Sequence, residues 1–252
     1  MKVRVENLVF SYPNFTLEVA GQTFVDARVT SIVGPNGAGK STFLKCLAAV
    51  LPAPRRSVFV NGNDLADLKG RSRARHVGYV PQEPALSFNY TVLDFVLTGR
   101  AASIPVFSSP SRHDFEAAEE ALRFVGLADF SARTYFELSS GERRLVLIAR
   151  TLAQRPDILL LDEPTTFLDP RHEVEILELV RRLAGEMNKT VIVTLHDLDM
   201  AVKYSDEMVF MKGGRVVASG PPADILNESL LRSVYDIEMG ILNVAGRRLI
   251  VR

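Results

Sequence analysis

A short glycine-rich segment, Gly34–Thr42, constrains the fold of this chain more than any other feature of its sequence. The segment reads GPNGAGKST, fits the pattern Gly-x4-Gly-Lys-Ser/Thr, and lies between an apolar run at Thr30–Val33 and a helical stretch at Thr42–Ala49. Glycines in such a loop allow backbone N–H groups to point into one concavity, and the following helix adds the positive end of its dipole. The segment therefore predicts a strand, a phosphate-binding loop and a helix in succession.

The residue types in this loop suit a nucleoside triphosphate and its magnesium ion. Lys40 can neutralise the terminal phosphates, and the hydroxyl of Ser41 can bind magnesium. A glycine-rich turn without a ligand is the alternative, and the flanking strand and helix favour the phosphate site. The predicted nucleotide contacts in the loop are Gly34, Pro35, Asn36, Gly37, Ala38, Gly39, Lys40, Ser41 and Thr42.

Short apolar runs that recur along the chain predict a mostly parallel sheet. Besides Thr30–Val33, such runs occupy Val77–Val80, Ile158–Leu161 and Val191–Leu195, and several are followed by helical periodicity. Strands that are buried on both faces have this continuous apolar character, because helices cover both sides of a parallel sheet. The predicted fold class is therefore α/β, and an apolar content of 47% suffices for a large core.

A different pattern surrounds the glycine-rich loop and predicts an antiparallel β subdomain. Residues 3–29 form shorter alternating segments with turn residues at Pro13-Asn14 and Gly21, and Val58–Val60 ends at Asn61-Gly62. Asn-Gly pairs and alternation of polarity are typical of hairpins. We therefore expect antiparallel strands within the first part of the chain.

Residues 83–137 lack buried runs and predict a helical subdomain. Thr91–Gly99 opens with a Thr-x-x-Asp cap, and Ser111–Gly126 ends at a glycine. We expect a single domain. Its core spans 1–82 and 138–220 and includes the antiparallel strands, and the helical subdomain spans 83–137. Residues 221–252 form a C-terminal helix and two strands that meet near Gly246. The apolar face predicted for the second helix consists of Phe115, Ala118, Leu122 and Val125.

Charge, cysteine content and hydropathy exclude several classes of protein. Lys plus Arg and Asp plus Glu both number 30, so the net charge is zero and no nucleic-acid partner is expected. The lone Cys46 cannot form an internal disulfide. Met1 leads directly into strand-like sequence, and no apolar run approaches the length of a membrane span. We expect a cytoplasmic protein that does not cross a bilayer unaided.

Two acidic residues, Asp162 and Glu163, follow the buried run Ile158–Leu161. One of these carboxylates can hold magnesium, directly or through water, and its neighbour can polarise an attacking water molecule. Pro164 is expected to keep Glu163 extended, away from the helical region. An acidic turn after a strand is the alternative, and the phosphate-binding loop favours the catalytic interpretation.

Polar residues also follow two other predicted strands. His196 comes after Thr190–Leu195, and Gln82 comes just after Val77–Val80. Ligands of open α/β sheets bind at the carboxyl ends of strands, so both side chains are candidates for contact with phosphate, magnesium or water. Each is a weak signal alone, since a lone histidine more often caps a helix or belongs to a core.

A further motif, Leu138–Glu142, reads LSSGE and precedes a helix with an apolar stripe. Ser139 and Glu142 form a capping box, which is the structural interpretation of the motif. The functional interpretation coexists with it, because a capped helix start with serine and glycine also forms an anion site.

With these motifs in this order, the chain resembles the nucleotide-binding subunits of ABC transporters over nearly its whole length. The resemblance implies a P-loop NTPase fold of the ABC type and ATP hydrolysis. The matching motifs are the Walker A loop at 34–42, the Gln loop at Gln82, the signature at Leu138–Glu142, the Walker B strand ending in Asp162-Glu163, the D-loop at Leu168-Asp169, and His196.

The resemblance implies a head-to-tail pair of chains that holds two ATP molecules between the Walker A loop of one copy and the signature of the other. Glu163 would be the general base or water-orienting residue, His196 would contact the γ-phosphate, and Asp169 would act across the interface. Tyr12 would stack on adenine. The signature residues facing the opposite ATP would be Ser139, Ser140, Gly141 and Glu142, and the Mg2+ ligands would be Ser41, Gln82 and Asp162.

Within the family, several stretches resemble importers of the iron-siderophore, haem and cobalamin group. Such importers pair two ATPase subunits with two permease subunits and a substrate-binding protein, so the chain would lie on the cytoplasmic face of the membrane. The segment 82–110 is the expected contact with the permease. The stretches are Thr91–Arg100, Glu142–Arg144 with Ile148–Gln154, and Gly220–Leu226 leading into Val234-Tyr235.

The chain departs from the usual signature Leu-Ser-Gly-Gly-Gln at Ser140 and Glu142. Ser140 adds a side chain where the backbone would approach phosphate, which puts the turnover rate in question more than the function. A non-transport ABC ATPase, such as one that serves iron-sulfur-cluster assembly, is the alternative function.

Overall fold

The computed structural model describes residues 2–82, 89–105, 107–244 and 247–251. A six-stranded sheet forms its centre, and neighbouring strands are parallel except β10, which pairs antiparallel with β9. The predicted α/β fold with a mostly parallel sheet is confirmed. In spatial order the strands are β6 (Val77–Val80), β7 (Ile158–Leu161), β8 (Thr190–Thr194), β3 (Val29–Val33), β9 (Glu207–Lys212) and β10 (Arg215–Gly220).

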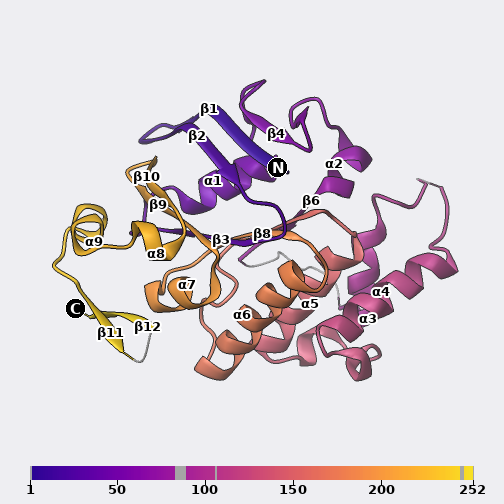
Figure 1. The fold of residues 1–252 in the computed structure, drawn as a ribbon. Helices are drawn as coiled ribbons and strands as arrows, with labels where there is room; N and C mark the ends of the chain where they lie inside the picture. The colour runs from indigo at the N-terminus through magenta and orange to yellow at the C-terminus, as the bar shows by residue number, and fades with distance from the viewer. Residues whose placement is uncertain (1, 83–88, 106, 245–246, 252) are drawn as a thin grey trace.

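A second, antiparallel sheet covers one face of the central sheet, with helix α1 (Lys40–Leu47) between the two (Figure 1). Phe43 and Leu44 of this helix are fully buried among side chains from both sheets. The expected turn at Gly21 is wrong, because Gly21 lies inside a strand and pairs with Glu6 in the ladder. The strands of this sheet are β2 (Phe15–Phe24), β1 (Val3–Tyr12), β4 (Val58–Val60) and β5 (Asn63–Asp64).

Helices cover the opposite face of the central sheet (Figure 1). Strand β7 shows why its sequence is apolar throughout: Leu159 and Leu161 pack against these helices, whereas Ile158 and Leu160 face α1 and the antiparallel sheet. Burial on both faces replaces the alternation of a half-exposed strand. The helices are α3 (Val92–Leu97), α4 (Arg112–Phe124), α5 (Ser140–Ala153) and α6 (Pro170–Gly185).

The first turn of α4 differs from the predicted apolar face. Phe115 is 38% exposed, whereas the other three residues predicted for that face are buried. The neighbouring Asp114 turns inward instead, where its carboxylate accepts a hydrogen bond from Arg100 Nε at 3.0 Å. Hydrogen bonds from Ser111, together with Arg100, lower the pKa of Asp114 to about 2, so the pair remains ionised.

The remaining elements are short, and most lie at the periphery. Residues 245–246, near which the two C-terminal strands were expected to meet, lie outside the described part of the chain. Among the residues that the structure describes, no helix is long and apolar enough to span a membrane. These elements are α2 (Gly70–His76), the 3-10 helices Thr98–Arg100, Ala128–Phe130 and Tyr135–Glu137, α7 (Leu198–Tyr204), α8 (Pro222–Ile225), α9 (Glu228–Tyr235), β11 (Gly240–Val244) and β12 (Arg247–Val251).

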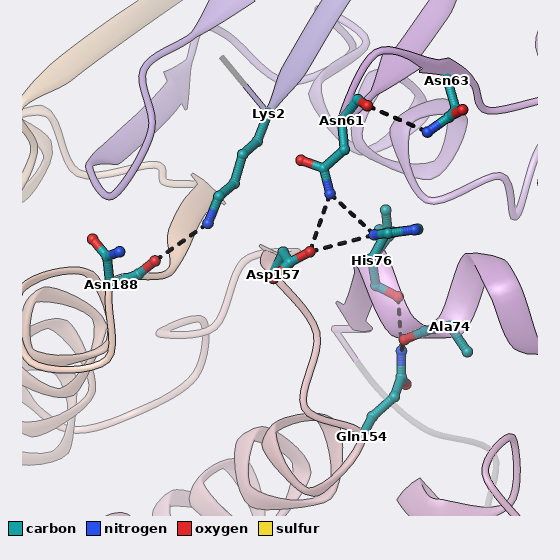
Figure 2. Close-up of polar contacts among 9 residues, drawn as sticks. Lys2, Asn61, Asn63, Ala74, His76, Gln154, Asp157 and Asn188 are labelled. Atoms are coloured by element: carbon teal, nitrogen blue, oxygen red, sulfur yellow. Dashed lines mark hydrogen bonds and ion pairs between the residues drawn. The ribbon is translucent and has the colours of Figure 1, made fainter.

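A polar cluster joins the antiparallel sheet to the central sheet (Figure 2). Asn61 follows β4, and its side-chain amide lies 3.0 Å from His76 Nδ1 and donates to Asp157 Oδ2 at 3.1 Å. Asp157 directly precedes β7, and its Oδ2 also lies 3.3 Å from His76 Nδ1. His76 therefore has a structural role at the end of α2, where it contacts Asn61 and Asp157.

Gly99, in the 3-10 helix Thr98–Arg100, allows this segment to approach α5, the helix that begins at the signature motif. A Cβ atom at this position would lie 2.0 Å from the carbonyl oxygen of Arg150. We expect Gly99→Ala to destabilise the protein by about 1–3 kcal/mol, because the backbone of α5 would have to shift. Gly185→Ala is the matched control: nothing lies within 4 Å of the added Cβ, and alanine favours the helix that Gly185 ends. Urea unfolding of both variants measures the difference, and equal stability of the two would contradict the proposed close contact.

Candidate functional site

The Walker A loop leaves β3 and enters α1 as the sequence predicts. Gly34 directly follows β3, with φ +153°, and a Cβ there would lie 2.1 Å from the carbonyl oxygen of Met211 in β9. Gly39 caps α1 with φ +98°, in the left-handed region that glycine favours. Both glycines are therefore required by the path of the backbone.

Lys40 is almost fully buried, at 5% exposure, at the start of α1. Its ammonium donates to the carbonyl oxygens of Gly34 at 2.9 Å and Pro35 at 3.1 Å. Burial lowers the pKa of Lys40, and the carboxylates of Glu163 and Asp162 offset part of that effect. A cation thus lies within the loop and close to both acidic residues.

Asp162 receives hydrogen bonds from three neighbouring segments. Ser41 donates to Oδ1 at 2.8 Å and Thr194 donates to the same oxygen at 3.0 Å. Tyr79 donates to Oδ2 at 3.0 Å, and burial, followed by the Asp162 carboxylate, raises the pKa of this tyrosine, which keeps its hydroxyl protonated. The carboxylate is 3% exposed and held in one orientation.

Glu163 lies next to Asp162 and is held by side chains from separate strand ends. His196 Nε2 lies 2.6 Å from Oε1, and Gln82 Nε2 donates to Oε2 at 2.9 Å. Thr166 contributes a longer bond to Oε2 at 3.3 Å. The structure therefore brings together the three residues predicted to be catalytic.

The backbone of Glu163 differs from the expectation that Pro164 would keep it extended. Its φ is +47°, in the left-handed region, which is uncommon for a residue with a side chain. Proline disfavours the right-handed helical region for the preceding residue but does not select between the remaining regions. The Glu163 N–H donates to Thr194 Oγ1 at 2.7 Å, and this bond accompanies the observed conformation.

A pocket of about 370 Å³ opens over the Walker A loop. Tyr12 lines it and is 46% exposed, and its ring packs edge-on against Phe10 at 4.9 Å between centroids. Phe15, which the sequence analysis did not single out, lines the same pocket and packs against the Cα of Gly39 so closely that a Cβ there would lie 2.6 Å from its ring. Glu163 and Lys40 line the same pocket, where the phosphates are expected.

The signature motif lies apart from this pocket. Ser139 caps α5 and forms the predicted capping box, since Glu142 N–H donates to Ser139 Oγ at 3.3 Å and Ser139 N–H donates to Glu142 Oε2 at 2.7 Å. The backbone N–H of Ser139 is the main cause that lowers the pKa of Glu142. Ser140 is exposed and lines a separate cavity of about 300 Å³ whose lining shares no residue with the Walker A pocket.

Gly141 and Asp169 meet at a single histidine. A Cβ on Gly141 would lie 2.4 Å from the ring of His172, and His172 Nδ1 lies 2.5 Å from Asp169 Oδ2. Asp169 also caps α6, because its Oδ1 accepts from the backbone N–H groups of Arg171 and His172. His172 therefore links the D-loop to the signature within one chain.

The residues around Asp162 fit a magnesium ion. Ser41 and Asp162 offer one neutral and one anionic oxygen 2.8 Å apart, and Mg2+ is bound in proteins by such oxygens together with water and phosphate. Gln82 lines a cavity with both of them and supplies a further amide oxygen. Thr194 and Tyr79, which orient Asp162, were missed in the sequence analysis, because only the order of strands in the sheet brings them there.

Comparison with known proteins agrees with these motifs. Residues 19–166 match the model of the ABC transporter family. The ferric enterobactin transport ATP-binding protein FepC of Escherichia coli K12 is 33% identical to this chain, over 99% of this chain and 93% of FepC.

Solved structures show the same similarity. A metal-chelate type ABC transporter in an inward-facing conformation contains a chain with a TM-score of 0.86 and 29% identity, over 99% of this chain and 96% of that chain. A dimeric ATP-binding cassette in a post-hydrolysis state, bound to ADP and phosphate, has a TM-score of 0.73 and 26% identity, over 87% of this chain and 98% of that chain.

Proposed function

This chain belongs to the ABC transporter family as an ATP-hydrolysing subunit, and we propose that it energises an importer of a metal chelate through a separate membrane permease. The observation that carries the ATPase part of the proposal is that Lys40 and Glu163 line the Walker A pocket, with Asp162 bonded to Ser41 of the same pocket. The similarity to a ferric enterobactin transport protein and to a metal-chelate type transporter supports a chelate such as an iron-siderophore, haem or cobalamin.

Hydrolysis is proposed to take place in a head-to-tail pair of these chains. Within one chain Ser140 of the signature lines a different cavity from the Walker A loop, which supports a site that uses both motifs only with a second copy. The similarity to a dimeric cassette bound to ADP and phosphate supports this arrangement. Ser139, Ser140 and Gly141 would then face the γ-phosphate of the opposite ATP, and Asp169 would act across the interface.

The chemistry is assigned to residues at the carboxyl ends of the central strands. Glu163 is the proposed general base, because its carboxylate lies beside the phosphate loop and is oriented by Gln82 and His196. His196 would also contact the γ-phosphate, and Lys40 would neutralise the phosphates. A bound magnesium ion, held by Ser41 and Asp162 with Gln82 nearby, would supply positive charge to the phosphate oxygens.

Contact with the permease is assigned to the segment 82–110. Residues 83–88 and 106 of this segment lie outside the described residues. Phe107 is fully exposed, as expected for an aromatic side chain that a partner covers. Through this contact the chain would lie on the cytoplasmic face of the membrane, and a substrate-binding protein would act only indirectly.

Affinity purification from detergent-solubilised membranes, with and without ATP, tests the transport function. We expect recovery of a membrane protein with several spans, and stimulation of ATP hydrolysis in the assembled complex by an iron chelate or a corrinoid. Phe107→Asp should reduce recovery of that protein while ATP binding is kept, because it introduces charge into the proposed contact. Val217→Asp, at an exposed position of β10, is the control and should not reduce recovery.

Recovery of soluble partners alone would contradict the importer function and leave the ATPase activity intact. It would favour the alternative of a non-transport ABC ATPase. Stimulation by a solute of another class would overturn the assignment of a metal chelate.

A further inference from the structure

Thr194 is a fully buried polar residue at the end of β8, a strand whose sequence is TVIVT. Its hydroxyl both accepts and donates a hydrogen bond. Oγ1 accepts a hydrogen bond from the backbone N–H of Glu163 at 2.7 Å and donates to Asp162 Oδ1 at 3.0 Å. One hydroxyl therefore connects the proposed magnesium ligand to the proposed general base.

The hydrogen bond from Glu163 to Thr194 holds the backbone of Glu163 in an unfavourable conformation. With φ at +47° and a proline following it, Glu163 adopts a conformation that costs free energy unless its surroundings hold it. The backbone N–H of Glu163 points to β8, where it donates to Thr194 Oγ1. A half-buried amide that loses its partner is unfavourable, so removal of the hydroxyl should release this turn.

The bond to Asp162 completes a set of three donors. Ser41 shares Oδ1 with Thr194, and Tyr79 donates to Oδ2. Among the described residues, Tyr79 thus orients the same carboxylate as Thr194 without a hydrogen bond to Glu163. A variant of Tyr79 therefore tests the orientation of Asp162 alone, whereas a variant of Thr194 tests the orientation of both Asp162 and Glu163.

We propose that Thr194 is a positioning residue for ATP hydrolysis, whose hydroxyl holds Asp162 and Glu163 in their working orientation relative to each other. This inference rests on the roles proposed for these two acidic residues. Thr194 is fully buried and acts through these two acidic residues.

The test compares Thr194→Val, which keeps the shape and loses the hydroxyl, with Thr194→Ser, which keeps the hydroxyl. We expect Thr194→Val to lower kcat by about 10- to 100-fold and to raise the magnesium concentration for half-maximal activity, with a smaller change in KM for ATP. Thr194→Ser should stay within about threefold of the wild type. Thr194→Ala carries the same expectation as Thr194→Val if the latter does not fold.

A second readout needs neither metal nor nucleotide. Hydrogen exchange of the Glu163 amide, measured by NMR in the nucleotide-free protein, should become at least about tenfold faster in Thr194→Val and remain slow in Thr194→Ser. Tyr79→Phe should weaken the response to magnesium without changing exchange at Glu163.

Unchanged kcat and unchanged exchange in Thr194→Val would overturn the inference, as would equal losses in the valine and serine variants. The proposed function fails separately: a wild-type protein that does not hydrolyse ATP would overturn that function. A wild-type protein that hydrolyses ATP, together with a fully active Thr194→Val variant, would overturn only the role of Thr194.

Discussion

Replacement of Glu163 by glutamine is expected to lower kcat for ATP hydrolysis by about 10²- to 10⁴-fold while ATP binding persists. Glutamine has nearly the same size, but its amide cannot accept the proton of the attacking water. The contacts from Gln82 and His196 orient the carboxylate that the substitution would replace. ATP that binds without being hydrolysed should then hold two copies together, because it remains between their opposing sites.

Turnover at saturating ATP and the molar mass in solution with ATP and magnesium measure both effects. Glu163→Gln should be dimeric with ATP under conditions in which the wild-type protein returns to monomers. Glu178→Gln, at an exposed position of α6, is the matched control and should behave as the wild type. Wild-type turnover in Glu163→Gln would remove Glu163 from its proposed role.

Replacement of Lys40 by alanine is expected to weaken ATP binding by about 10- to 100-fold and to abolish measurable turnover. The ammonium is buried within the loop and bonds two loop carbonyls, so the substitution removes both a charge that faces the phosphates and a contact that shapes the loop. Charged hydrogen bonds of this kind are stronger than neutral ones.

Isothermal titration with ATP measures this loss directly. Lys69→Ala, which removes an exposed lysine before α2, should leave the affinity unchanged. The melting temperature without nucleotide distinguishes lost affinity from lost folding. A folded Lys40→Ala protein with wild-type affinity would contradict the assignment of the pocket to the phosphates.

The sequence predicted the central sheet well for a physical reason. Burial on both faces gives strands such as Ile158–Leu161 an apolar side chain at every position, so a short continuous apolar run predicts such a strand. The starts of two helices could also be predicted from the sequence, because Thr91 and Ser139 cap them by local hydrogen bonds. These signals depend on neighbours in sequence.

Contacts between residues that are distant in sequence could not be predicted from the sequence. Tyr79, Asp162 and Thr194 meet because β6, β7 and β8 lie side by side, and this order cannot be derived from any one of the runs. The left-handed backbone of Glu163 likewise accompanies its bond to Thr194, and the local rule for a residue before proline does not select this region. Gly21 is expected at a turn but pairs with Glu6, because this pairing is not encoded in the neighbouring residues.

The roles proposed for the signature require a second copy of the chain, and mixing two inactive variants tests them most directly. Lys40→Ala keeps the signature, whereas Ser140→Glu keeps the Walker A loop and puts a negative charge where the opposite γ-phosphate is expected. Each variant alone should be inactive, and an equal mixture should regain up to about a quarter of wild-type ATPase activity, because half of the pairs then contain one intact shared site. No gain of activity on mixing would contradict the shared site, and the central claim of a head-to-tail pair would fail.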